Sequence, residues 1–244
     1  MEVVFVHGAL VRDGMWWWQP TADLLYEYTG IRSSAVALPS CGETEPEAIT
    51  GGLVADAAAV RDALDGLDSA IVVGHSYGGT VIAEAGAHPA VRNLIYVSSY
   101  LPDIGQAQGM IMSGETDPVR IVDNGDGTLG VAGYDAPSFG ARFLQDADDE
   151  AQRGGWDRVT PQAVSAFTTP TSAAGWQGVD STYVVCGQDR STSLELQRYH
   201  ADRATRAVEL PTGHHPFVTH PGLMVEQVTA VLGGRSRAGA KNDY

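Results

Sequence analysis

The chain has 244 residues, a formal net charge of −15 and 43% hydrophobic residues. This composition is typical of a globular protein with a sizeable core, whereas disordered chains have fewer hydrophobic residues. The negative charge argues against nucleic acid or an anionic membrane surface as a partner, because both are themselves negatively charged.

The N-terminal sequence and the cysteine content favour a cytoplasmic protein. No stretch approaches the roughly 18 consecutive apolar residues of a membrane-spanning helix. Met1 leads almost directly into the apolar run Val3–Val6 rather than into the pattern of a signal peptide. Cys41 and Cys186 are expected to be free thiols, since a secreted disulfide-stabilised protein of this size would carry more cysteines.

Short apolar runs and helical patterns alternate along the chain. Strands are expected at 3–6, 34–38, 70–73, 94–97, 182–186 and 207–210, and helices at about 53–67, 79–88, 194–203 and 224–232. Strands that alternate with helices indicate a mostly parallel sheet that is covered by helices on both faces.

One long segment, residues 102–178, interrupts this alternation. It is rich in Gly, Asp, Ser and Thr, has no strong strand pattern, and is too long for a plain loop. We interpret it as an inserted lid over the sheet's carboxyl edge, partly helical around 139–149 and 161–167. The core would then comprise residues 1–101 and 179–233, and residues 234–244 would form a flexible tail.

Residues 74–78 read Gly-His-Ser-Tyr-Gly, which matches the G-x-S-x-G motif. A serine hydroxyl needs an exposed position and a neighbouring base to act as a nucleophile. The motif provides the position only where it joins a strand to a helix. Here it directly follows the strand expected at 70–73 and precedes the helix expected from Gly79. We therefore predict that Ser76 is a nucleophile.

The loop after the first strand carries His7, Gly8 and Ala9. Acyl transfer places negative charge on a carbonyl oxygen, which backbone N–H groups can stabilise. In a strand–turn–helix nucleophile site these donors come from the residue after the serine and from an early loop. The backbone N–H groups of Tyr77 and Ala9 are therefore the expected oxyanion hole, and His7 is expected to hold the loop by hydrogen bonds.

The base and the acid are expected after the last two strands, since the order in such sites is serine, acid, histidine. His214 follows Gly213 beyond the strand at 207–210 and is the preferred base, with His215 and His220 as alternatives. Asp189 follows the strand at 182–186 and is the preferred acid, with Asp103 as its rival. His75 adjoins the serine but is expected to point back under the sheet.

Five stretches resemble one branch of the α/β-hydrolase superfamily. They are VHGALVRDGMWWW (6–18), VVGHSYGGTVIAEA (72–85), LIYVSSYLPDIGQ (94–106), YVVCGQDRSTSLELQR (183–198) and TGHHPFVTHP (212–221). The branch contains small bacterial esterases, plant methyl-ester hydrolases and plant hydroxynitrile lyases. The resemblance implies a six-stranded, mostly parallel sheet and a lid with short helices.

Two departures from this branch bear on the reaction. The hydroxynitrile lyases carry a lysine directly after the catalytic histidine, where this chain has His215, and its only lysine is Lys241. Perhydrolases of the superfamily often carry methionine after the nucleophile, where this chain has Tyr77. Both differences favour hydrolysis over the lyase and perhydrolase reactions.

The expected pocket is aromatic and apolar. Trp16, Trp17, Trp156, Phe167 and Trp176 are its candidate lining residues. Aromatic walls with few polar groups suit a small apolar or aromatic carboxylic ester, and carbamates and amides would react by the same chemistry. A cofactor-free lyase and a non-catalytic ligand-binding relative are the alternative functions. We expect no metal or cofactor and a small-molecule substrate as partner; a homodimer is left open.

Overall fold

The computed structural model describes residues 1–44 and 48–233, and the expected tail at 234–244 lies outside them. Among the described residues, six strands form one sheet in the order β2-β1-β3-β4-β8-β9, and every pairing between neighbours is parallel. The strands are β1 (Glu2–Val6), β2 (Ser33–Ala35), β3 (Ala70–His75), β4 (Val91–Val97), β8 (Ser181–Cys186) and β9 (Arg206–Leu210). The expected parallel sheet is thus confirmed.

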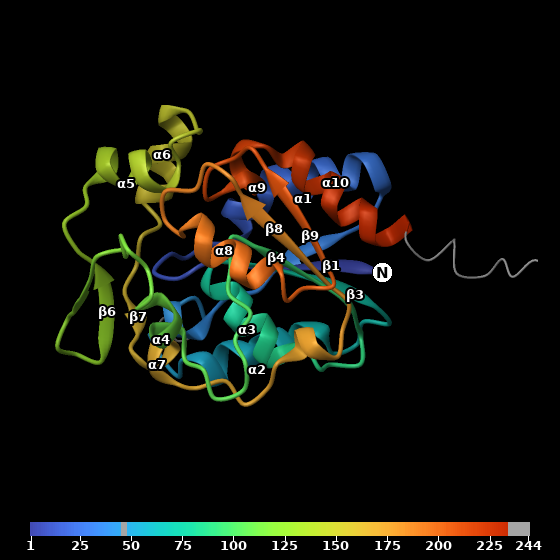
Figure 1. The fold of residues 1–244 in the computed structure, drawn as a ribbon, viewed down its shortest axis with the longest axis horizontal. Helices are drawn as coiled ribbons and strands as arrows, with labels where there is room; N and C mark the ends of the chain where they lie inside the picture. Colours follow the sequence, from blue (N-terminus) through green and yellow to red (C-terminus); the bar gives the residue numbers. More distant parts are fainter. Residues whose placement is uncertain (45–47, 234–244) are drawn as a thin grey trace, which may run out of the picture.

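Helices cover both faces of this sheet (Figure 1). On one face lie α1 (Gly14–Thr29), α9 (Pro216–Thr219) and α10 (Pro221–Gly233). On the other lie α2 (Leu53–Leu64), α3 (Tyr77–Ala85) and α8 (Leu194–Ala201).

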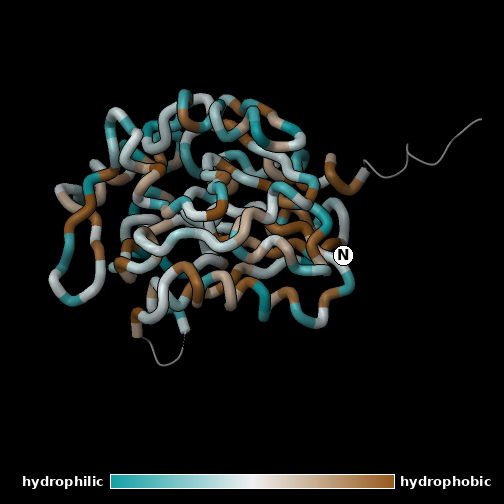
Figure 2. Tube along the Cα trace, turned by 60° about the horizontal axis from the view of Figure 1, so that its bottom comes forward, coloured by the Kyte–Doolittle hydropathy of each residue, from teal (hydrophilic) through white to brown (hydrophobic). Residues whose placement is uncertain are grey.

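Alternate residues of each strand enter opposite cores, as the two-residue period of a strand requires. In β1, Val4 and Val6 pack with α2 and α3, whereas Val3 and Phe5 pack with α1 and α10. Because both faces are covered, the central strands are almost continuously apolar. This explains why short apolar runs located them in the sequence. Figure 2 shows the apolar segments running through the middle of the molecule.

Helix α1 was not expected from the sequence. Its buried side chains nevertheless follow a helical spacing, at Trp17, Trp18, Thr21, Ala22 and Leu25. Pro20 lies inside the helix and obscures the pattern, because proline normally argues against a helix interior. Trp18 stacks between Phe5 and Phe217, with ring centroids 4.4 and 3.9 Å away. The tryptophan run therefore belongs mainly to the core.

Most of residues 102–178, from about 108 to 168, gather at the end of the molecule opposite the N-terminus (Figure 1). They contain a small antiparallel sheet that the sequence did not reveal, because its strands are only two to four residues long. The helix expected at 139–149 is broken in two where the Asp148 side chain accepts a hydrogen bond from the Ala151 N–H. The elements are α4 (Gln108–Met112), β5 (Ile121–Asp123), β6 (Thr128–Val131), α5 (Ala136–Phe143), α6 (Asp149–Trp156), β7 (Gln162–Ala163) and α7 (Ser165–Thr168).

Two short 3₁₀ helices, η1 (Pro39–Cys41) and η2 (Gly175–Gln177), complete the described elements. Cys41 and Cys186 are both buried free thiols, as expected. Among the described helices, none combines the length and the apolar character that crossing a bilayer would need.

Candidate active site

Ser76 lies at the turn between β3 and α3, with φ 49° and ψ −121°. A non-glycine residue rarely adopts positive φ, and such strain, of order 1–3 kcal/mol, is often found at functional sites. The turn places Ser76 at the carboxyl edge of the sheet, where it lines a cavity. This is the strand–turn–helix context that the motif requires.

The glycines around Ser76 are needed for close backbone packing. A Cβ atom on Gly74 would lie 2.6 Å from the Gly78 carbonyl oxygen, and one on Gly78 would lie 2.5 Å from the Val6 carbonyl oxygen. A Cβ on Gly8 would lie 3.2 Å from the Ser76 Cβ. Any side chain at Gly74 or Gly78 would push α3 away from the sheet, and one at Gly8 would crowd the serine.

His214 and Asp189 meet at the same edge of the sheet. The His214 Nδ1 and Asp189 Oδ2 atoms are 2.7 Å apart, and both side chains are almost fully buried. His214 also lines the cavity that contains Ser76. Within the part of the chain that the structure describes, the Ser76 hydroxyl makes no hydrogen bond to His214. Catalytic hydrogen bonds of this kind often tighten only when substrate binds.

Of the rival residues, His215 lines the cavity, but its Nδ1 contacts the Phe143 carbonyl oxygen rather than a carboxylate; the other two lie elsewhere. Asp103 forms an ion pair with Arg203 at 2.6 Å and accepts a hydrogen bond from Gln177. The His220 Nδ1 lies 3.5 Å from an Asp146 carboxylate oxygen. Neither Asp103 nor His220 lines the cavity.

Ser98 is a residue of the site that the sequence analysis missed. It follows β4, which lies between β3 and β8 in the sheet, so it falls between the strand ends that carry Ser76 and Asp189. Its φ is 40°. Its hydroxyl donates a hydrogen bond to Asp189 Oδ2 and lies 3.2 Å from His214 Nδ1. The only available signal was its position at a strand end.

Asp189 is held as a carboxylate by these contacts. Its other oxygen, Oδ1, accepts hydrogen bonds from the N–H groups of Ser191 at 2.6 Å and Thr192 at 3.1 Å. Burial alone would raise the pKa of Asp189, but the adjacent His214 and the hydrogen bonds hold that pKa below its usual value. An ionised carboxylate at this position orients the imidazole and stabilises an imidazolium.

The two expected oxyanion donors are fixed by separate buried groups. The Tyr77 hydroxyl donates to Asp56 at 2.6 Å, which anchors the start of α3. His7 anchors the loop before Ala9, as expected, through a 2.6 Å contact from its Nε2 to Glu43 and one of 2.8 Å from its Nδ1 to the Gly8 carbonyl. Within the described residues, neither the Ala9 N–H nor the Tyr77 N–H has a hydrogen-bond partner.

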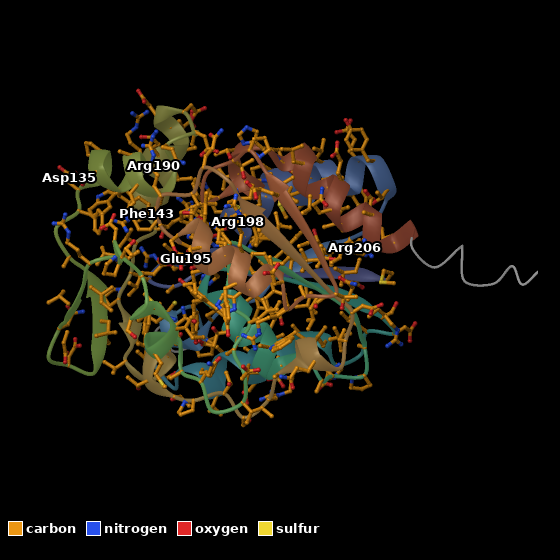
Figure 3. All side chains as sticks on the ribbon, viewed as in Figure 1. Asp135, Phe143, Arg190, Glu195, Arg198 and Arg206 are labelled. Carbon is orange, nitrogen blue, oxygen red and sulfur yellow. The ribbon has the colours of Figure 1, made fainter. Side chains whose placement is uncertain are left out.

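The cavity beside Ser76 has about 630 Å³ of empty space, part of it open to solvent, and its lining is mostly apolar. Much of that lining comes from the inserted segment, and Figure 3 shows Phe143 where α5 meets the core. Gln108, Tyr100 and Ser191 contribute polar groups. The apolar lining residues of the insertion are Met112, Val119, Ile121, Val131, Phe139, Phe143 and Phe167.

Of the five expected lining residues, Phe167 lines the cavity and the four tryptophans lie elsewhere. Trp16 packs under the Arg158 guanidinium, 4.1 Å from its ring centroid. Trp17 is buried behind His215, with ring centroids 4.8 Å apart. Trp156 packs against Phe139. Trp176 packs under Arg203 and donates a hydrogen bond to Pro102. Aromatic character alone did not distinguish packing from lining.

His75 was expected to point back under the sheet, and this expectation is wrong. The His75 ring lies beside those of His214 and His215. Its ring centroid is 4.5 Å from that of His214 and 4.6 Å from that of His215. Burial, reinforced by His214, lowers the pKa of His75 well below its usual value and that of His215 to about 3. Both rings are therefore neutral near pH 7. This cluster could not be predicted from local sequence patterns, because only tertiary contacts bring His75 to the other two.

A hydroxyl, an imidazole held by a buried carboxylate, and the unpaired N–H group of Ala9 thus lie at one apolar cavity, and the unpaired N–H group of Tyr77 directly follows the hydroxyl in the chain. Together these groups can carry out acyl transfer through a tetrahedral intermediate. Residues 3–227 match the family model described as the Alpha/beta hydrolase family.

Three relatives cover nearly the whole chain. A carbendazim hydrolyzing esterase from Nocardioides sp. is 27% identical over 93% of this chain and 98% of its own. Methylesterase 9 of Arabidopsis thaliana is 23% identical over 93% and 96% of the two chains. The crystal structure of a pyrethroid hydrolase from Sphingobium faniae has a TM-score of 0.79 and 22% identity, over 96% and 98% of the two chains.

Proposed function

Because this chain belongs to the alpha/beta hydrolase family, with the fold expected from its sequence, we propose that it is a serine esterase. Ser76 is the nucleophile, His214 the general base and Asp189 the carboxylate that orients the base. The observation that carries this proposal is the 2.7 Å contact between His214 and the buried Asp189, at the cavity that Ser76 lines.

The reaction proceeds through an acyl-enzyme. The Ser76 oxygen attacks the ester carbonyl carbon while His214 Nε2 takes its proton, and the carbonyl oxygen becomes an oxyanion. The imidazolium then gives that proton to the leaving alcohol as the carbon–oxygen bond breaks. Water, deprotonated by His214, attacks the acyl-enzyme in the same way and releases the carboxylic acid and free Ser76.

The backbone N–H groups of Ala9 and Tyr77 stabilise the oxyanion. Both N–H groups lack partners among the described residues, and Ala9 lines the cavity, which supports this role because an unpaired donor at a cavity is available to a ligand oxygen. Losing one such donor typically costs a factor of about 10²–10³ in kcat. The buried contacts of Tyr77 with Asp56 and of His7 with Glu43 keep the donors fixed before substrate arrives.

The substrate is a small, apolar or aromatic carboxylic ester, with carbamates and amides as further candidates. The apolar lining from the insertion supports this choice, since it offers few groups that could compensate a charged substrate. The names of the relatives, a carbendazim hydrolyzing esterase, a methylesterase and a pyrethroid hydrolase, also favour ester-like substrates.

The test combines labelling by a fluorophosphonate probe with turnover of p-nitrophenyl acetate. Wild type is compared with Ser76→Ala and His214→Ala, and His220→Ala serves as the control because its ring lies outside the cavity. We expect labelling and turnover in wild type and the control, and the loss of both in the first two variants. Folded wild-type protein that neither labels nor turns over would refute the proposal.

A further inference from the structure

Three histidines meet in the wall of the cavity. His75 ends β3, and His214 and His215 lie in the loop after β9. One ring nitrogen from each lies within 4.8 Å of the corresponding nitrogens of the other two. All three side chains are at most 5% exposed, yet all three line the cavity. A ligand in the cavity therefore lies next to the cluster.

Each ring keeps one nitrogen lone pair available. The Nδ1 atom of His214 is committed to Asp189, and the Nδ1 atom of His215 donates to the Phe143 carbonyl at 2.9 Å, so both rings keep Nε2. The buried Nε2 atom of His75 has no hydrogen-bond partner among the described residues. A buried polar nitrogen without a partner is unusual, and a bound water or ion is one way to satisfy it.

We propose that His75, His214 and His215 form an inhibitory site for a divalent transition-metal ion, with Zn²⁺ as the preferred ion. Zn²⁺ binds neutral imidazole nitrogens at about 2.0–2.1 Å, and three histidines with one open position are a common set. Tetrahedral geometry with these bonds places the nitrogens about 3.4 Å apart. In this structure the nitrogens lie within 4.8 Å of one another, so binding requires them to approach by up to about 1.4 Å.

The surroundings of the cluster favour a bound cation. Metal-binding histidines usually donate their second ring nitrogen to a carboxylate or a backbone carbonyl, which fixes the ring and increases its basicity. Asp189 does this for His214, and the Phe143 carbonyl does it for His215. The net charge of −15 also raises the local concentration of cations.

Inhibition follows from the role of His214, and this part of the inference rests on the proposed function. The lone pair on His214 Nε2 that must accept the Ser76 proton would instead be donated to the metal. The bound enzyme would thus have no free base. Removal of the ion by a chelator would restore the lone pair and the activity.

Metal binding can be measured without using activity. Protein treated with EDTA and then freed of chelator is titrated with ZnCl₂ in a calorimeter, and with CoCl₂ while visible absorption of four-coordinate Co²⁺ is recorded. We expect one tight site in wild type and in the inactive Ser76→Ala variant. His75→Phe and His215→Phe, which keep an aromatic ring, should each bind Zn²⁺ at least 10-fold more weakly. The matched control His220→Ala should bind like wild type.

Inhibition is measured with p-nitrophenyl acetate, as the Zn²⁺ concentration that halves each variant's own metal-free rate. That concentration should rise at least 10-fold in the two phenylalanine variants, and EDTA should reverse the inhibition. If wild type is active but binds no Zn²⁺ tightly, or if both phenylalanine variants bind Zn²⁺ as wild type does, the metal site is overturned and the esterase proposal stands. If wild type binds one ion tightly, both phenylalanine variants lose that site, and wild type shows no turnover, the metal site is supported and the esterase proposal is refuted. Binding without inhibition of active enzyme would overturn the inhibitory role.

Discussion

Removing the Ser98 hydroxyl should slow catalysis without displacing the proposed triad. Hydrogen bonds to charged groups contribute about 1.5–3 kcal/mol, but Asp189 keeps the N–H bonds from Ser191 and Thr192 and its contact with His214. We therefore take the lower end of that range for Ser98→Ala. Since about 1.4 kcal/mol corresponds to a factor of ten, kcat should fall about 10-fold.

The pH profile should report the same change. The Ser98 hydroxyl helps to hold the pKa of Asp189 down against burial. Without it that pKa rises, so the ionised carboxylate is lost at a higher pH. The loss of activity that accompanies protonation of Asp189 should accordingly begin at a higher pH in the variant.

The assay is p-nitrophenyl acetate hydrolysis over a range of pH, with thermal melts followed by circular dichroism. Ser98→Gly is the second variant, because glycine tolerates the φ of 40° and should lose the same activity while melting no lower than Ser98→Ala. Ser138→Ala is the matched control: Ser138 also donates to an aspartate, Asp135, but is exposed and lies outside the cavity. Wild-type kcat in both Ser98 variants, with activity lost over the same pH range as in wild type, would refute the reasoning.

Three further predictions concern the acid, the oxyanion loop and stability. Asp189→Asn should lower kcat by about 10⁴, whereas Asp103→Asn, which loses only an ion pair with Arg203, should stay within about 2-fold in the same assay; equal losses would contradict the choice of acid. Gly8→Ala should lower kcat about 10-fold with little change in melting temperature, because its Cβ would crowd Ser76. Burial lowers the pKa of His200 to about 3, so below about pH 6.5 the unfolded chain binds more protons. The contribution of the neutral His200 side chain to stability is complete above that pH and falls by up to about 1.4 kcal/mol per pH unit as the pH drops toward 3. In urea titrations at several pH values, the unfolding free energy of His200→Asn should therefore fall with decreasing pH less steeply than that of wild type, by about that amount. An unchanged pH dependence would contradict the prediction.

Local patterns were enough to locate most of the sheet and the candidate triad. The strands of a doubly covered parallel sheet are short apolar runs, so β1, β3, β4, β8 and β9 could be found without knowing their partners. Parallel strands also bring their carboxyl ends to one edge. Polar residues that follow successive strands, such as Ser76, Asp189 and His214, can therefore be placed together from chain order alone.

The cavity wall and the supporting contacts depend on which segments pack together, and this is not encoded in any one stretch. Trp17 and Phe143 are both aromatic residues on helices, yet one packs behind His215 and the other lines the cavity. Ser98 and His75 likewise gained their roles only from the sheet order and from the loop that carries His214. The sequence by itself determined the strand pattern and the order of the reactive groups. Only the tertiary structure decided the lining, the support of Asp189 and the three-histidine cluster, because each of these depends on contacts between residues far apart in the chain.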